Sequence, residues 1–335
     1  MEQNSSAKTL WKKVAGLILG TFLLAGSFVM PSQAQSYPDK PIRMVIIFPP
    51  GGGIDTVGRI IGTKLSETIG QPVVPENRAG AGGNVGLDFV AKARPDGYTL
   101  AVMSETLVLS PSLYKSLSYD PVKDLLPVAR VAQVPVVLLV RPDLPIKNLN
   151  EFVEYAKSNP GKITYGTAGV GSAPHLGGEL LKNLAKIDIL HVPYKSVAAA
   201  VVGMMGGEVE AAFLAITAAA PQVEAGKVRA LAVLSETRAL SLPDVPTAKE
   251  AGIDNLVVPI WYGFVAPAGT PPNIINQLNS EINKITAMPD IKEKIQKAGI
   301  EPLPGSTPEE FSEFIKKEIP NWEKIINGAN IPKID

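Results

Sequence analysis

Short apolar runs of strand length alternate with helix-length amphipathic patterns along most of this chain. The run 42–48 is expected to be an apolar strand and is broken by Pro-Pro-Gly-Gly-Gly, after which Asp55 is expected to be the N-cap of a helix. Apolar side chains then recur at helical spacing, which predicts one buried face made of Val57, Ile60, Ile61, Leu65 and Ile69. A strand at 73–74, a helix at 85–92 and a strand at 98–103 follow. This order predicts a parallel α/β sheet.

The same alternation restarts at the strand 134–140, which predicts a second α/β lobe. Its other expected elements are helices at 149–157, 173–184 and 197–205 and strands at 163–166, 189–192, 209–214 and 228–234. An apolar run then leads into three amphipathic helices, near 272–287, 290–297 and 308–327. Helices at the end of an α/β chain usually pack back on the first domain. We therefore predict that residues 35–140 and 261–335 form lobe 1 and residues 141–260 an inserted lobe 2, with a ligand cleft between the lobes.

The N-terminal segment has the three parts of a secretory signal peptide. Three lysines supply the positive region, residues 14–30 carry no charge, and Ser32 and Ala34 are the small residues before the cleavage point. An uncleaved anchor helix is the alternative, because seventeen uncharged residues nearly reach the length of a membrane span. The helix-breaking Pro31 and the small residues favour cleavage after Ala34, which predicts a soluble protein in the periplasm.

Composition narrows the range of functions. Hydrophobic residues make up 45% of the chain and charged residues 19%, which is typical of a globular protein and not of a disordered one. The signal segment holds three of the 32 basic and one of the 32 acidic residues, which leaves 29 basic and 31 acidic residues. This balance gives no electrostatic basis for binding nucleic acid or an anionic membrane. The absence of cysteine excludes a thiol nucleophile, a thiolate metal site and a lipidated N-terminal cysteine.

Two glycine-rich loops each join an expected strand to an expected helix, at 48–55 and at 166–175. Glycines let a ligand approach the backbone, and the helix that follows presents unpaired N–H groups and the positive end of its dipole. Either loop alone could be an ordinary tight turn. Because each lobe carries one, the pair favours a site that holds an anion without arginine or lysine.

Ser104, Glu105 and Thr106 follow the third expected strand, at the edge where open α/β sheets bind ligands. The two hydroxyl groups can hydrogen-bond a carboxylate, although an ordinary capping turn would use the same residues. Glu105 does not suit an anion site. We expect it to point away, or to meet a hydroxyl or cationic group of the ligand.

Other chemistries find less support. Ser172 and His175 could act as nucleophile and base, but no GxSxG elbow surrounds the serine, and no acid within the stretch 166–175 obviously orients the histidine. We therefore expect a binding or structural role for both, a structural role for His191, and no enzyme activity. The run 80–86 reads GxGxxxG rather than GxGxxG, and the chain has no Gly-Lys-Ser/Thr triplet and no HExxH motif. These absences predict neither a cofactor nor a metal.

Nine segments, in order and with matching spacing, resemble the tripartite tricarboxylate transporter receptors, also called the Bug family: YPDKPIRMVIIFPPGGGIDTVGR, QPVVPENRAGAGGNVG, PDGYTLAVMS, YDPVKDLLPVA, GTAGVGSAPHLGGELL, DILHVPYKS, GKVRALAV, LPDVPTAKEAG and FVAPAGTPP. The resemblance covers essentially everything after the signal peptide. It implies a type II periplasmic-binding-protein fold. It also implies that the protein closes around one ligand and delivers that ligand to a two-subunit inner-membrane transporter. Carried over by position, the family's carboxylate contacts fall on Pro50, Gly51, Gly52, Ser104, Thr106, Ala168, Gly169, Gly171, Ser172 and His175.

Two departures from the family pattern bear on the ligand. The family usually follows Tyr-Lys with glycine, whereas Tyr194 and Lys195 lead into Ser196. The family also often has an aspartate after an apolar strand, where it would suit the ammonium group of an amino acid, and this chain has none near Ala215. We therefore expect the ligand to be a mono-, di- or tricarboxylate, aromatic ones included, rather than an amino acid. We also expect the receptor to be a monomer. A binding module that serves a sensor and a Ser/His hydrolase stay open as alternatives.

Overall fold

The structure, a computed structural model, describes residues 37–258, 260–329 and 331–334. The chain divides into two units, Met1–Asp39 and Lys40–Asp335, and the elements below belong to the second unit. The predicted signal peptide and its cleavage after Ala34 lie outside the described residues. None of the described helices combines the length and the apolar character that crossing a membrane requires.

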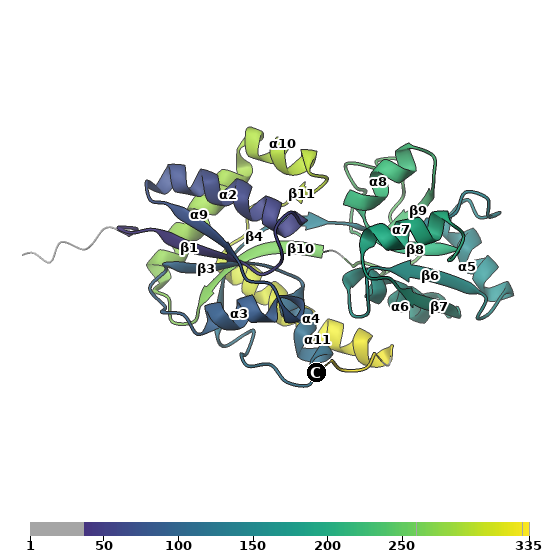
Figure 1. Cartoon of the computed structure of the whole chain (residues 1–335), viewed down its shortest axis with the longest axis horizontal. Coiled ribbons are helices and arrows are strands. Elements are labelled where there is room, and N and C mark those ends of the chain that lie inside the picture. The colour runs from purple at the N-terminus through teal and green to yellow at the C-terminus, as the bar shows by residue number, and fades with distance from the viewer. Residues whose placement is uncertain (1–36, 259, 330, 335) are drawn as a thin grey trace, which may run out of the picture. The chain divides into compact units, whose positions relative to one another are not determined.

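The first sheet contains six strands: β1 (Ile42–Ile46), β2 (Val73–Asn77), β3 (Thr99–Ser104), β4 (Leu125–Val134), β10 (Ile260–Pro267) and β11 (Glu301–Pro302). Their order across the sheet is β11-β4-β10-β3-β1-β2 (Figure 1). β1 pairs in parallel with β2 and with β3, which confirms the parallel arrangement predicted for the first three strands. β10 lies antiparallel between β3 and β4, so the sheet as a whole is mixed.

The second sheet contains five strands: β5 (Val136–Val140), β6 (Ile163–Thr167), β7 (Ile189–Pro193), β8 (Ala211–Ala215) and β9 (Arg229–Val233). Their order is β7-β6-β8-β5-β9, with β5 antiparallel to both of its neighbours (Figure 1). The prediction that the chain crosses to the second lobe near Val140 places β5 in the wrong sheet. The ladder breaks earlier, at Pro135, because proline has no N–H to donate. We propose the lobe boundary there, with the return to the first sheet at Ile260.

Helices cover both faces of each sheet, as parallel strands require. Those of the first sheet are α2 (Gly53–Ile69), α3 (Asn84–Ala91), α4 (Thr106–Leu113), α9 (Pro272–Ala287), α10 (Pro289–Lys297) and α11 (Pro308–Gly328). Those of the second are α5 (Leu149–Ser158), α6 (Ala173–Ala185), α7 (Val197–Met205) and α8 (Ile216–Glu224), and a short 3-10 helix, η1, spans Ala81–Gly83. In the first sheet, α9 and α11 pack on β4, and α10 packs on α2 (Figure 1).

The core of the first sheet lies between β1 and the predicted face of α2. Val57, Ile61 and Leu65 are fully buried there, whereas Ile60 and Ile69 are only partly buried. The helix approaches the strand closely because glycines face it: a Cβ at Gly62 would lie 2.6 Å from Met44 Cε. This packing fixes the start of α2 against the ends of the strands.

Candidate functional site

A pocket of about 370 Å³ opens where β1 and β3 end and β10 begins. Its lining residues are Phe48, Pro49, Pro50, Gly52, Gly53, Ile54, Ser104, Glu105, Ile260 and Tyr262. This is the carboxyl edge of the parallel strands, where open α/β sheets bind ligands. The volume and the mostly apolar walls suit a small organic molecule. The pocket brings together three of the predicted contacts: Pro50, Gly52 and Ser104.

The loop between β1 and α2 is held in place by Asp55. The sequence predicted Asp55 as the N-cap, but α2 begins at Gly53 with Gly52 as its N-cap, which places Asp55 in the first helical turn. From there its carboxylate accepts hydrogen bonds from the Gly51 N–H at 3.0 Å, from Arg59 Nε at 2.9 Å and from Asn77 Nδ2 at 2.9 Å. Burial would raise the pKa of Asp55, but these hydrogen bonds outweigh it and lower the pKa. Asp55 therefore stays ionised and fixes the loop.

This arrangement leaves the start of α2 available to a ligand. The N–H of Gly51, a predicted contact, donates its hydrogen bond to Asp55. Gly51 adopts a positive φ of 90°, which favours glycine. The N-cap residue Gly52 makes no side-chain hydrogen bond to the helix. The first N–H groups of an uncapped helix can bind an anion. At Gly51 and Gly52 an added Cβ would meet no atom within 4 Å, so the backbone is open on that side.

Tyr262 of β10 lines the pocket beside Gly53 and was not among the predicted contacts. Its hydroxyl oxygen would lie 2.6 Å from a Cβ placed on Gly53, so only glycine fits at that position. Burial raises the pKa of Tyr262, and the nearby charge of Glu105 raises it further. The phenol therefore stays neutral. In the sequence, Tyr262 could have been noticed because its side chain carries a hydroxyl group within the apolar run 257–266.

Ser104 and Thr106 lie next to each other at the end of β3. Their hydroxyl oxygens are 3.1 Å apart, and the Thr106 N–H donates to Ser104 Oγ at 3.4 Å. Ser104 lines the pocket, whereas Thr106 is not among its lining residues. Thr106 thus orients the Ser104 hydroxyl through its backbone N–H.

Glu105 lines the pocket instead of pointing away from it. Its Oε2 is shielded from solvent and has no hydrogen-bond partner among the described residues. Burial raises the pKa of Glu105 to about 7, and hydrogen bonds from its own backbone, from Ser104 and from the backbone of Trp261 oppose this only in part. The sequence showed the glutamate but not its burial, because burial depends on β10 and the loop before α2.

The other five predicted contacts lie in the loop after β6 and in the first turn of α6, and none of them lines this pocket: Ala168, Gly169, Gly171, Ser172 and His175. Ser172 is the N-cap of α6: its Oγ donates to Gly169 O at 2.8 Å and accepts from the His175 backbone N–H at 3.4 Å. The Gly171 N–H donates to His175 Nδ1 at 3.0 Å. The polar groups of this loop therefore hold the loop itself.

The imidazole rings of His175 and His191 stack on each other next to that loop. The ring centroids of His175 and His191 are 3.9 Å apart, and His191 Nε2 lies 2.7 Å from Thr167 Oγ1. Burial lowers the pKa of both histidines to about 4, and Lys182 adds to the effect at His175. Both rings are therefore neutral at neutral pH. A nucleophile–base pair would need Ser172 Oγ on the His175 ring, but the contact recorded for Ser172 is with the backbone of His175.

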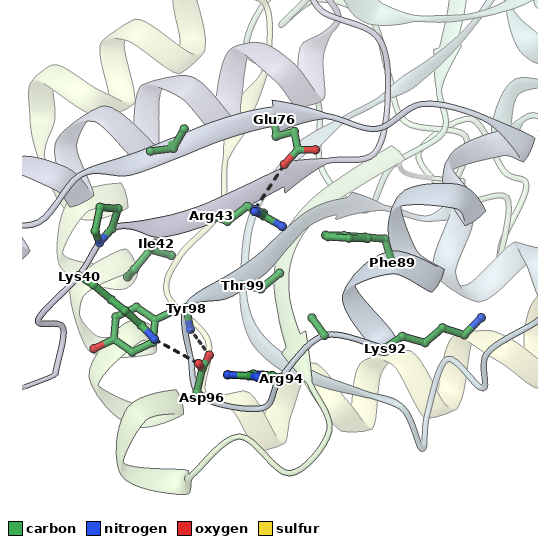
Figure 2. A pocket seen from close by; sticks show the side chains of 13 residues that line it. Lys40, Ile42, Arg43, Glu76, Phe89, Lys92, Arg94, Asp96, Tyr98 and Thr99 are labelled. Atoms are coloured by element: carbon green, nitrogen blue, oxygen red, sulfur yellow. Dashed lines mark hydrogen bonds and ion pairs between the residues drawn. The ribbon is translucent and has the colours of Figure 1, made fainter.

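A second hollow, of about 730 Å³, opens near the starts of β1 and β3, at the opposite edge of the first sheet. Figure 2 shows two ion pairs among its lining residues: Arg43 Nε is 3.4 Å from Glu76 Oε2, and Lys40 Nζ is 3.5 Å from Asp96 Oδ2. Exposed ion pairs of this kind contribute little, and Lys92 and Arg94 also line the hollow. Ligands of open α/β sheets bind at the carboxyl edge of the strands, however, and this hollow lies at the other edge. The carboxyl-edge pocket is therefore the better candidate.

Among the described residues, no group of three or more His, Cys, Asp or Glu side chains is placed to hold a metal ion. The chemistry of the pocket is that of capture: backbone N–H groups, one serine hydroxyl, one phenol and one half-buried carboxyl group with a shielded oxygen, within apolar walls. Two α/β sheets joined by two crossings, with such a pocket at a carboxyl edge, define a solute-binding protein of the periplasmic-binding-protein fold.

The model of the tripartite tricarboxylate transporter family receptors matches residues 57–331, and the chain belongs to this family. Its relative BugT of Bordetella pertussis is 37% identical over 318 residues, which are 94% of this chain and 97% of BugT. A solved R. palustris protein with adipate is 33% identical, with a TM-score of 0.76 over 89% of this chain and 100% of that one. MatC of Rhodopseudomonas palustris with bound malate is 35% identical, with a TM-score of 0.71 over 87% of this chain and 100% of MatC. The fold and the family expected from the sequence are confirmed.

Proposed function

We propose that this protein is a periplasmic receptor that captures a small carboxylate in the pocket at the ends of β1 and β3. The observation that carries the proposal is the pocket itself, where apolar walls meet the uncapped start of α2 and the Ser104 hydroxyl. A helix N-terminus attracts a carboxylate through its free N–H groups and its dipole. The relatives solved with adipate and with malate support a dicarboxylate, because both of those ligands carry two carboxyl groups.

The proposed contacts divide into two sets. Pro50, Gly52 and Ser104 face the ligand, while Gly51 and Thr106 position them. The loop before α6 would contribute the second set when the lobes close on the ligand: Ala168, Gly169, Gly171, Ser172 and His175. In that set the hydrogen bonds to His175 and Gly169 keep the loop in shape, so backbone groups would make the contact.

A panel of carboxylates measured by thermal shift and calorimetry tests the proposal. Adipate, malate and benzoate should bind more tightly than aspartate or glutamate, because residues 211–220 include no acidic side chain that could pair with an ammonium group. A ligand at 100 times its Kd should add about 2.7 kcal/mol to the free energy of unfolding. Tightest binding of aspartate or glutamate, or no binding by any member of the panel, would contradict the proposal.

Ser104→Ala tests where the ligand sits. A hydrogen bond to a charged group contributes about 1.5–3 kcal/mol, so the affinity for the best dicarboxylate should fall roughly ten- to a hundredfold. Ser66→Ala on α2 is a matched control, because Ser66 bonds to Gln71 O and does not line the pocket. If both variants bound as tightly as the wild type, the ligand site would lie elsewhere.

The partner we propose is a two-subunit inner-membrane transporter, which a monomeric receptor would load. Capture and closure would serve a sensor equally well, so the role needs a test in cells. Deleting the receptor gene should abolish uptake of the ligand, and the intact gene should restore it. Loss of a transcriptional response with unchanged uptake would favour the sensor instead.

The family is one of receptors, and we propose capture without turnover. Prolonged incubation of the best ligand with excess protein, followed by mass spectrometry, should return the ligand unchanged. A product that forms with the wild type and not with Ser172→Ala would favour a hydrolase.

A further inference from the structure

Glu105 is the polar group in the pocket that the capture of an anion leaves unexplained. It stands directly after β3 as the N-cap of α4, but its side chain makes no capping hydrogen bond to that helix. Its Oε2 is shut off from solvent and unpartnered among the described residues, while the residue lines the pocket. A buried polar atom without a partner costs free energy and calls for an explanation.

The walls around this carboxyl group provide no positive charge. They consist of phenylalanine, proline, glycine and isoleucine, with Ser104 and Tyr262 as polar neighbours, and include no Lys, Arg or His. From β10 the titratable group that faces Glu105 is Tyr262, a neutral phenol. From α2 the nearest charge is Asp55, whose carboxylate is turned to Gly51, Arg59 and Asn77. From β4, Arg130 lies over the ring of Phe314 at 4.1 Å, on α11.

A carboxyl group in such surroundings is favoured in its neutral form, because burial disfavours the charge and no cation compensates for it. Burial accordingly raises the pKa of Glu105 to about 7. A neutral carboxylic acid has one O–H to donate. When a second carboxyl group comes close, the two share one proton, since like charges cannot both ionise at short range.

We propose that Glu105, in its neutral form, donates a hydrogen bond to a carboxylate of the ligand, so that the protein captures the anion together with one proton. This inference rests on the proposed function, because it requires an anion in the pocket. The proton stays on Glu105, shared with the ligand oxygen, and no covalent bond forms or breaks. Glu105 looked unsuited to an anion site, but as a hydrogen-bond donor it becomes the specificity determinant of that site. The site can then bind a carboxylate without a cationic side chain.

The proposal fixes how affinity depends on pH. Below about pH 7 the free protein already carries the proton, and the affinity should be constant. Above that pH the complex must take a proton from solution, so the affinity should fall about tenfold for each pH unit. Adipate is almost fully ionised above pH 7, so the fall in affinity above that pH belongs to the protein.

Calorimetry with adipate from pH 6 to pH 9 tests this, in pairs of buffers that differ in ionisation enthalpy and so count protons. The wild type should take up close to one proton at pH 9 and almost none at pH 6. In Glu105→Gln the amide donates at every pH, so the affinity should lose its pH dependence and exceed that of the wild type at pH 9. The matched control is Glu318→Gln, on α11: burial also raises the pKa of Glu318, but it does not line the pocket, and the wild-type profile should persist.

Two binding results would overturn the inference while leaving the receptor function intact. One is a wild-type affinity for adipate that does not change between pH 6 and pH 9, or a Glu105→Gln variant that keeps the wild-type slope. The other is a loss of more than a hundredfold in Glu105→Gln at every pH together with tight binding of aspartate, which would make Glu105 the charged partner of an ammonium group.

A measurement without ligand separates this inference from the proposed function. In carbon NMR of the wild type, the Glu105 carboxyl resonance, assigned by its absence from Glu105→Gln, should titrate near pH 7. A midpoint near the ordinary value of 4.5 would overturn the inference alone. Failure of every carboxylate in the panel to bind would overturn the proposed function and this inference with it.

Discussion

Replacing Glu105 by glutamine should make the ligand-free protein more stable than the wild type at alkaline pH. Burial raises the pKa of this carboxyl from its ordinary value of 4.5 to about 7 in the folded protein. In the unfolded chain the group is in water and titrates at its ordinary value. Between pH 4.5 and pH 7 the folded state therefore binds more protons than the unfolded state, and the stability of the wild type falls as pH rises through that window.

The size of the effect follows from the two pKa values. Each pKa unit corresponds to about 1.4 kcal/mol, so the ionisation of Glu105 removes roughly 3 to 4 kcal/mol of stability once the pH is well above 7. Glutamine keeps nearly the same shape and carries no charge. The stability of Glu105→Gln relative to the wild type should therefore increase by up to that amount between pH 4 and pH 9.

Urea unfolding of the ligand-free proteins at a series of pH values measures this difference directly. Glu323→Gln is the control, because that glutamate is exposed, and its stability relative to the wild type should stay within about 0.5 kcal/mol across the range. A stability difference between Glu105→Gln and the wild type that does not vary with pH would refute the reasoning. It would show that Glu105 titrates at the same pH in the folded and unfolded states.

The stacked histidine pair should make the protein sensitive to acid, because desolvation lowers the pKa of His175 and His191 from 6.5 to about 4. In that pH window the unfolded chain binds protons that the folded chain does not bind, so stability falls as the pH falls. His191→Phe should lose less stability than the wild type between pH 6.5 and pH 4 in urea titrations, and an equal loss would count against the pair. Gly171→Ala should lower the melting temperature more than Gly226→Ala: both glycines have a positive φ, which costs about 1–2 kcal/mol for alanine, but only at Gly171 would the new Cβ press on Leu113, at 3.2 Å. Equal melting temperatures would show that the Leu113 contact is unimportant.

Local pattern was enough to predict much of the fold. Helical spacing identified the buried face of α2 through Val57, Ile61 and Leu65, and the strand–helix order predicted the parallel pairing of β1 with β2 and β3. These features depend on neighbours a few residues apart, which is the range over which periodicity acts. The strand β4 was missed for most of its length, because its apolar and polar positions alternate irregularly and the antiparallel β10 stabilises it.

The sequence by itself determined which chemistry was available: two glycine loops at helix starts, a serine and threonine after a strand, and neither cysteine nor a metal motif. Tertiary structure decided how these groups are used. It turned Asp55 from a predicted N-cap into a clamp on Gly51, and it engaged the Ser172 hydroxyl within its own loop. It also brought Tyr262 of β10 against Gly53 and enclosed Glu105. Burial and hydrogen-bond competition arise from segments far apart in the chain, so no local pattern could show that this glutamate is neutral enough to face an anion.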